Sequence, residues 1–206
     1  MTITNGYCTL AEFKAYYTTR GGSSTNTDTN DDGVAEGVIE GASRLIDRIT
    51  GRVFYVSSSD ETRYFTADDK ETVFIDDLSS ITSLKVDDDG DRSYGTTLSS
   101  TDYDLMPYNS ALVGWPYTWI ELAPLTDESF TSYRKGIEIV GKFGFPAVPD
   151  DINEACLGIT LNIYNERSGQ SSAGNVSVTA AGVIIRPSGV PDWAMKILNK
   201  YKKLTT

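Results

Sequence analysis

The chain of 206 residues contains no histidine. This absence removes the commonest general base, the commonest zinc ligand and every Ser/His or Cys/His nucleophile pair. The sequence also lacks a dinucleotide-binding glycine motif, a Walker loop and a hydrolase nucleophile elbow. Its 29 acidic residues are spread mainly through turns, so no carboxylate pair is marked by its spacing. The sequence therefore predicts a protein without enzymatic activity, with a carboxylate glycosidase as a distant alternative.

Cysteine is scarce, and long apolar runs are missing. Cys8 and Cys156 are the only two cysteines, and both lie on or beside predicted helices. This count favours reduced, buried thiols over a disulfide framework. No segment approaches the roughly 18 consecutive apolar residues of a membrane helix, and no charged leader precedes an apolar run. We expect no membrane partner and no cofactor.

Basic residues are outnumbered. The chain carries 18 Lys and Arg against 29 Asp and Glu, a net charge of −11. Such a charge disfavours broad attraction to nucleic acid or anionic membranes, and it also helps keep a protein soluble. In a closed ring of such chains, the inner wall would carry excess acid and would not hold DNA. Arg44, Arg48 and Arg52, four residues apart, are the main basic stripe that opposes this view.

Helix signals dominate the first quarter of the chain. Thr9 and Glu12 have the spacing of a capping box, which predicts a short helix ending near Gly21. A polar loop follows, and apolar residues then recur at helical spacing from Val34 to Ile49. Asp31 or Asp32 is expected to cap this second helix, and Gly51 to end it. Residues 1–51 are therefore predicted to form a helical hairpin.

The middle of the chain changes to a period of two, typical of β-strands. Residues 52–145 are predicted to be a large antiparallel β insertion, and Asp87–Asp91 a hairpin turn around Gly90. The expected strands are 52–56, 61–66, 72–75, 81–87, 103–106, 119–122 and 136–143.

A strand-to-helix joint follows at Pro146 and Pro149. Asp150 or Asp151 can cap the next helix, and its wide apolar surface over 152–167 predicts packing on more than one neighbour. Gly158, in its middle, predicts a close backbone approach. Residues 146–168 are thus predicted to form a main helix packed on the hairpin. Residues 169–206 read as a Ser/Gly linker and an extended strand-plus-helix docking tail, and the whole chain as α+β.

Two acidic runs raise the question of calcium. Residues 28–33 match the start of a calcium loop, but Ile39 stands where a bidentate Glu belongs. Asp87–Asp91 is what a tight turn requires. We therefore predict no metal site, although ion binding at the first loop stays open. Trp115, Tyr117 and Trp119 could form a stacking surface for a sugar, or belong to the core.

The order of these segments resembles the head–tail connector (adaptor) proteins of tailed bacteriophages and gene transfer agents. The matching stretches are Thr62–Phe65, Phe143–Pro146, Val148–Ile152, Tyr164–Arg167, Gly182–Arg186, Val190–Trp193 and Ile197–Lys203. Small members of that family lack an insertion as large as 52–145.

The resemblance implies a non-enzymatic virion protein, assembled in the host cytoplasm. It implies a twelve-fold ring beneath the portal protein that extends the DNA channel and docks the next neck, stopper or tail protein. Double-stranded DNA would pass through without specific binding.

The residues themselves support this reading. A detached apolar tail needs a partner, because unpaired strands and apolar side chains are costly in water. The expected portal-binding residues are Val176, Val178, Val183, Ile184, Ile185, Trp193, Ile197, Leu198 and Tyr201. The alternative is a calcium- or carbohydrate-binding β module of a phage surface or tail protein.

Overall fold

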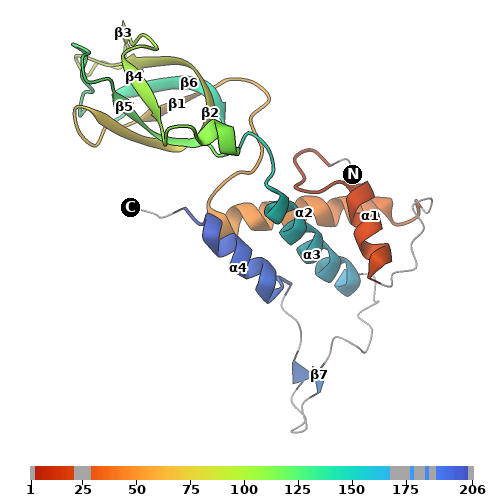
Figure 1. The fold of residues 1–206 in the computed structure, drawn as a ribbon. Coiled ribbons are helices and arrows are strands. Elements are labelled where there is room, and N and C mark those ends of the chain that lie inside the picture. Colours follow the sequence, from red (N-terminus) through yellow and green to blue (C-terminus); the bar gives the residue numbers. More distant parts are fainter. Residues whose placement is uncertain (1–2, 21–28, 168–176, 179–183, 186–188, 204–206) are drawn as a thin grey trace. The chain divides into compact units, whose positions relative to one another are not determined.

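The computed structural model describes residues 3–20, 29–167, 177–178, 184–185 and 189–203. These residues form four α-helices, a six-stranded antiparallel sheet and a separate two-stranded pair (Figure 1). The helices lie toward both ends of the chain and the strands of the sheet in the middle, so the protein is α+β as predicted. None of the described helices is long and apolar enough to cross a membrane.

The chain divides into two compact units. The helical unit consists of Met1–Arg52 and Val148–Thr206, and the β unit of Val53–Ala147. The helical unit is thus built from both ends of the chain, and the β unit is inserted between them. Each unit has its own buried apolar core.

The first helix, α1 (Leu10–Thr19), begins at the predicted capping box. The Thr9 hydroxyl accepts the Glu12 amide at 3.2 Å, and the Glu12 carboxylate accepts the Thr9 amide at 2.7 Å. This exchange satisfies two backbone amides that the helix itself cannot pair. The buried face of α1 carries Phe13 and Tyr17, whose rings both contact Tyr164 edge-on.

The second helix, α2 (Asp32–Thr50), ends as predicted at Gly51, which has the left-handed φ of 68°. It begins at Asp32, as predicted, but the expected capping contact is absent. Asp31 occupies the cap position, but its side chain makes no capping hydrogen bond. It instead accepts the hydroxyl of Tyr164 at 3.4 Å, because the third helix brings that residue within reach.

The third helix, α3 (Asp150–Arg167), packs against α1, α2 and α4, which confirms that it has more than one neighbour. Leu157 and Tyr164 are buried and Leu161 is half-buried. The predicted cap at Asp150 or Asp151 is wrong, since both residues lie inside the first turn. The Asp151 carboxylate accepts the Tyr201 hydroxyl at 2.8 Å.

The last helix, α4 (Asp192–Tyr201), packs on α3 through Ala194, Leu198 and Tyr201. A Cβ added at Gly158 would collide with the indole of Trp193, so this glycine provides the close approach that its position predicts. The chain then returns to α2, where the Lys203 amide donates to the Thr50 carbonyl at 2.8 Å. The helix that was expected to belong to a detached docking tail, α4, thus lies inside the helical unit.

The sheet of the β unit has the strand order β1-β6-β2-β5-β4, with β3 paired to β2. The strands are β1 (Glu61–Phe65), β2 (Thr72–Val86), β3 (Thr96–Thr97), β4 (Tyr103–Met106), β5 (Tyr117–Leu122) and β6 (Ile137–Phe143). The two strands predicted over 72–75 and 81–87 are one strand, β2. Register shifts near Leu78 and Ile81 let it continue through polar residues.

The strand predicted over 52–56 is wrong. This segment follows the end of β6 with only separate hydrogen bonds, from Phe145 to Val53 and from Ser57 to Phe143. The hairpin predicted at Asp87–Asp91 is confirmed, since it joins β2 to β3 with Gly90 at a φ of 83°. Asp87 is buried, and its carboxylate accepts the Gly90 and Arg92 amides.

Two short strands, β7 (Ser177–Val178) and β8 (Ile184–Ile185), pair with each other antiparallel. The prediction of strand structure over 176–185 is therefore met by these four residues. Val176 and Val183 lie outside the described residues.

Candidate functional site

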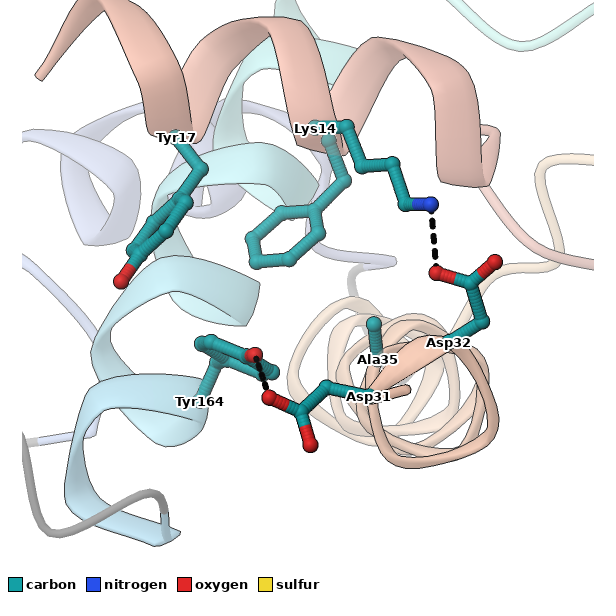
Figure 2. Close-up of a pocket in the computed structure, with 7 residues that line it drawn as sticks. Lys14, Tyr17, Asp31, Asp32, Ala35 and Tyr164 are labelled. Carbon is teal, nitrogen blue, oxygen red and sulfur yellow. Dashed lines mark hydrogen bonds and ion pairs between the residues drawn. The ribbon is translucent and has the colours of Figure 1, made fainter. Parts of the chain in front are cut away.

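A small pocket lies among α1, α2 and α3 (Figure 2). Its volume is about 40 Å³, against roughly 300–1,000 Å³ for a typical ligand site. Lys14 pairs with Asp32 across it at 2.5 Å, and Tyr164 donates to Asp31. The pocket has room for water, and its polar side chains tie the three helices together.

The two cysteines are free and buried, as predicted. Their Sγ atoms lie 3.6 Å apart, which links the segment before α1 to α3. The Cys8 pKa is raised above its usual range because the thiol hydrogen-bonds to Cys156 and is buried. A thiol that holds its proton so firmly is a poor nucleophile and a poor metal ligand.

The acidic runs are engaged in structure. Asp28 lies outside the described residues, while Asp31 and Asp32 contact Tyr164 and Lys14. At the other run, carboxylate oxygens of Asp87, Asp89 and Asp91 come within 4.8 Å of one another. Each of the three carboxylates accepts a backbone amide of its own turn. These contacts account for the cluster as turn geometry.

The aromatic residues near 115–119 do not form one platform. Trp115 contacts the ring of Phe145 at 5.5 Å, and Tyr117 packs against the core of the β unit. Trp119 instead lies beside Phe74, with ring centroids 6.2 Å apart.

One face of β2, β5 and β4 combines aromatic and acidic side chains. Phe74, Trp119 and Met106 form one cross-strand row, and Glu121 and Asp104 lie directly opposite each other in the next row. Phe74 is 60% exposed and the other four are half-exposed. We call these five residues the acidic–aromatic face. This face was not predicted from the sequence, although the alternation Trp119–Glu121 and Asp104–Met106 was a usable signal.

A second exposed apolar feature is the 3₁₀ turn η1 (Ser110–Val113). Leu112 is 83% exposed, Val113 72% and nearby Tyr108 61%. Side chains of this size are seldom so exposed on one short turn unless something covers them.

The charge is divided unequally between the two units. The β unit holds 17 of the 29 acidic and 7 of the 18 basic residues, a net charge of −10. The helical unit holds the other 12 acidic and 11 basic residues, a net charge of −1. Almost the whole charge of the chain therefore belongs to the β unit.

Several basic residues of the helical unit lie where α2 and α4 end. Arg52 donates to the Tyr201 carbonyl at 2.8 Å, and Gly51 lies beside Lys203. Exposed Arg48 and Lys200 lie close to these helix ends. Arg44 is held by Asp47 at 3.0 Å and donates to Asn5, so the three arginines do not act as one open stripe.

The residues expected to bind a portal fall into three groups. Val178, Ile184 and Ile185 lie in β7 and β8. Trp193 is 38% exposed and Ile197 half-buried, whereas Leu198 and Tyr201 are buried against the helical unit. The fold thus brings the last four together on α4 but leaves only Trp193 and Ile197 partly open.

Comparisons with known proteins give a likeness among solved structures. No family model matches this chain, and no curated protein matches it. Among solved structures it is similar to a chain in "Neck of empty GTA particle computed with C6 symmetry". The TM-score is 0.54 at 14% identity, over 100% of this chain and 94% of the other. The two chains share a fold across both units.

Proposed function

We propose that this protein is a structural head–tail connector (adaptor) of a tailed phage or a related particle. The observation that carries the proposal is the likeness to a neck chain over the full length of this protein. A match that includes the large β unit as well as the helices is more specific than a shared helical hairpin. The order of motifs in the sequence supports the same role independently.

In this role the protein works by assembly and has no catalytic step. The sequence supplies no histidine, and the pocket among α1, α2 and α3 is too small for a substrate. The exposed apolar turn at Leu112 and Val113 fits a subunit whose surfaces are covered by neighbours.

The assembly we propose is a ring beneath the portal in the virion, twelve-fold and built in the host cytoplasm. The related neck was computed with C6 symmetry, and a twelve-fold ring contains six-fold symmetry. The ring continues the DNA channel and presents a surface to the next neck or tail protein.

The DNA passes such a ring without specific binding. A net charge of −10 on each β unit, repeated around an axis, produces a strong negative field. We therefore assign the β unit to any wall that faces DNA. Binding of DNA by the isolated protein at about 50 mM salt, with a steep loss as salt rises, would contradict this part of the proposal.

The portal contact is assigned to the segment around β7 and β8. Val176, Val178, Val183, Ile184 and Ile185 form its apolar set, and Trp193 with Ile197 can extend it along α4. Leu198 and Tyr201 support this surface from inside the helical unit.

The decisive experiment is imaging of particles from the source phage with the chain located by its density. A ring of this chain between portal and tail supports the proposal, and a position on a fibre or capsid surface overturns it. For the portal contact, Ile184→Asp with Ile185→Asp is better than a truncation, because removing α4 would uncover α3. We expect this double variant to fold normally and to be absent from portal-bearing capsids.

A further inference from the structure

The acidic–aromatic face contains an electrostatic conflict. Asp104 on β4 and Glu121 on β5 are directly paired across the strands. Like charges in this arrangement destabilise a sheet. No cation of the described residues forms an ion pair with either carboxylate, whereas Arg63 and Lys85 elsewhere in the β unit are paired with acidic groups. The face therefore lacks a positive partner within the described part of the chain.

The carboxylates are held in place by neutral donors. The Trp119 indole donates to Glu121 at 2.8 Å, and the Tyr108 hydroxyl donates to Asp104 at 3.1 Å. The pKa of Tyr108 is raised, first by this hydrogen bond and then by the negative charges of Asp104 and Glu121. Two fixed negative charges thus lie beside the rings of Phe74 and Trp119.

The helical unit offers the opposite pattern on α4. Lys196 and Lys200 are one helical turn apart and form a row on α4 beside Trp193 and Ile197, the two residues assigned to the portal contact. We call the two lysines the lysine stripe. Both lysines are exposed, and no carboxylate of the described residues forms an ion pair with them. The buried residues of α4 pack on α3, and Trp193 also contacts α3 at Gly158, whereas the two lysines lie on the exposed side of the helix.

We propose that the lysine stripe of α4 in one copy binds the acidic–aromatic face of the next copy. Two ammonium groups would reach Asp104 and Glu121, while the lysine stems lie over Phe74 and Trp119. The inference rests on the proposed ring and adds the contact that would build it. Because two different surfaces meet, the contact is head-to-tail, and contacts of this kind form a ring when the rotation between copies closes.

Charge complementarity selects a second copy as the occupant. The β unit carries −10, and the unpaired lysines belong to the nearly neutral helical unit. Each copy offers one surface of each kind, so donors and acceptors match in number in any assembly. DNA would also attract the lysines, but a chain with a net charge of −11 repels it at longer range.

The test is reciprocal charge reversal in the full chain. One variant carries Asp104→Lys with Glu121→Lys, and the other carries Lys196→Glu with Lys200→Glu. We expect each alone to lose at least tenfold in self-association, measured by sedimentation at low salt. An equimolar mixture should regain the association of the native protein, because each variant then meets its complement at both surfaces.

One control variant and one cross-linking experiment separate the possible outcomes. Asp88→Lys with Asp89→Lys makes the same charge change at the far end of β2 and should leave association unchanged. Carbodiimide cross-linking of mixed ¹⁴N and ¹⁵N native protein should join Lys196 or Lys200 to Asp104 or Glu121 between copies. Links only within one copy, or variants that assemble normally, overturn the inference.

The same experiments keep the inference apart from the proposed function. If native rings form and both reversed variants also form them, the contact is wrong while the ring stands. If the lysine variant loses binding to a DNA duplex without any change in self-association, the stripe is a phosphate site and the inference fails.

Discussion

The two units of this chain are similar in size but differ in charge and in the way their elements are joined. The β unit carries −10 and has a core of aliphatic and aromatic side chains shared by its strands. The helical unit is almost neutral, and hydrogen bonds cross its helix contacts, from the Tyr7 amide to Ser43 at 3.0 Å and from Asn153 to the Tyr7 carbonyl at 2.9 Å. The β unit therefore carries the acidic surface of the chain, whereas the helical unit is held together by polar contacts between its segments.

This difference follows from how each unit is built. Strands join neighbours through their backbones, so their outward side chains are free to carry charge. The helices satisfy their backbones internally and can be fixed to one another only by side chains. Polar contacts between helices set their register, and some charges of the helical unit, such as Lys14 and Asp32, form ion pairs within it.

The largest expected effect is the loss of folding stability when a buried side chain is truncated in the core of either unit. Ile139→Ala removes a fully buried side chain from the β unit, and Ile159→Ala does the same on α3. We expect each to lower the free energy of unfolding by about 2–5 kcal/mol. Hydrogen exchange should show faster exchange mainly within 53–147 for the first variant and within the helices for the second. Equal acceleration in both units from either variant would contradict the division.

The contact of α3 with α4 can be tested at Gly158. In the native background Gly158→Ala should destabilise by about 1–3 kcal/mol, because the added methyl collides with Trp193. In a Trp193→Ala background the same change should stabilise by about 1 kcal/mol, since alanine is the better helix former. Chemical denaturation of the four proteins measures both steps. A change of the same sign in both backgrounds would rule out the close approach.

The hydroxyl of Tyr201 should make the stability of the helical unit fall at alkaline pH. Its pKa is raised by burial and by its hydrogen bond to Asp151, so the folded protein keeps this proton at a pH where the unfolded chain releases it. Stability should therefore be lost as the pH rises above about 10. Tyr201→Phe should cost about 1 kcal/mol near neutral pH and flatten the alkaline loss. Thermal denaturation between pH 7 and 11 tests this, and an unchanged slope would refute it.

The smallest effect should come from salt. Screening of a net charge of −10 should stabilise the β unit by about 1 kcal/mol or less between low salt and about 0.3 M NaCl. The helical unit, at −1, should respond less. Hydrogen exchange at the two salt concentrations would resolve the units. A larger response in the helices would show that local ion pairs outweigh net charge.

Local signals in the sequence were accurate where the physics is local. The Thr9–Glu12 capping box and the left-handed Gly51 depend only on neighbouring backbone groups, and both are present. Asp31 and Asp151 also looked like caps, but each accepts a tyrosine hydroxyl from another helix. A cap and a distant partner compete for the same carboxylate, and only the packed structure shows which one it binds.

The prediction of two separate strands on either side of Leu78 and Ser80 was wrong because contacts with distant segments decided the outcome there too. Residues 76–80, four of which are polar, separated the two predicted strands, yet β2 continues because β5 and β6 pair with it on either side and its register shifts absorb the irregularity. The acidic–aromatic face was equally hidden, since Asp104 and Glu121 are 17 residues apart and become neighbours only through strand pairing.

The sequence by itself determined the fold class, which is α+β with helices toward both ends and strands in the middle. It also determined the excess of acidic residues and the absence of histidine. Periodicity and composition express these properties directly, because each depends on residues near in the chain or on simple counts. Only the tertiary structure decided that α4 folds back onto α3 and that two carboxylates oppose each other beside an aromatic row. These features arise from contacts between distant segments, whose free energy is set by packing and is not written in any local pattern.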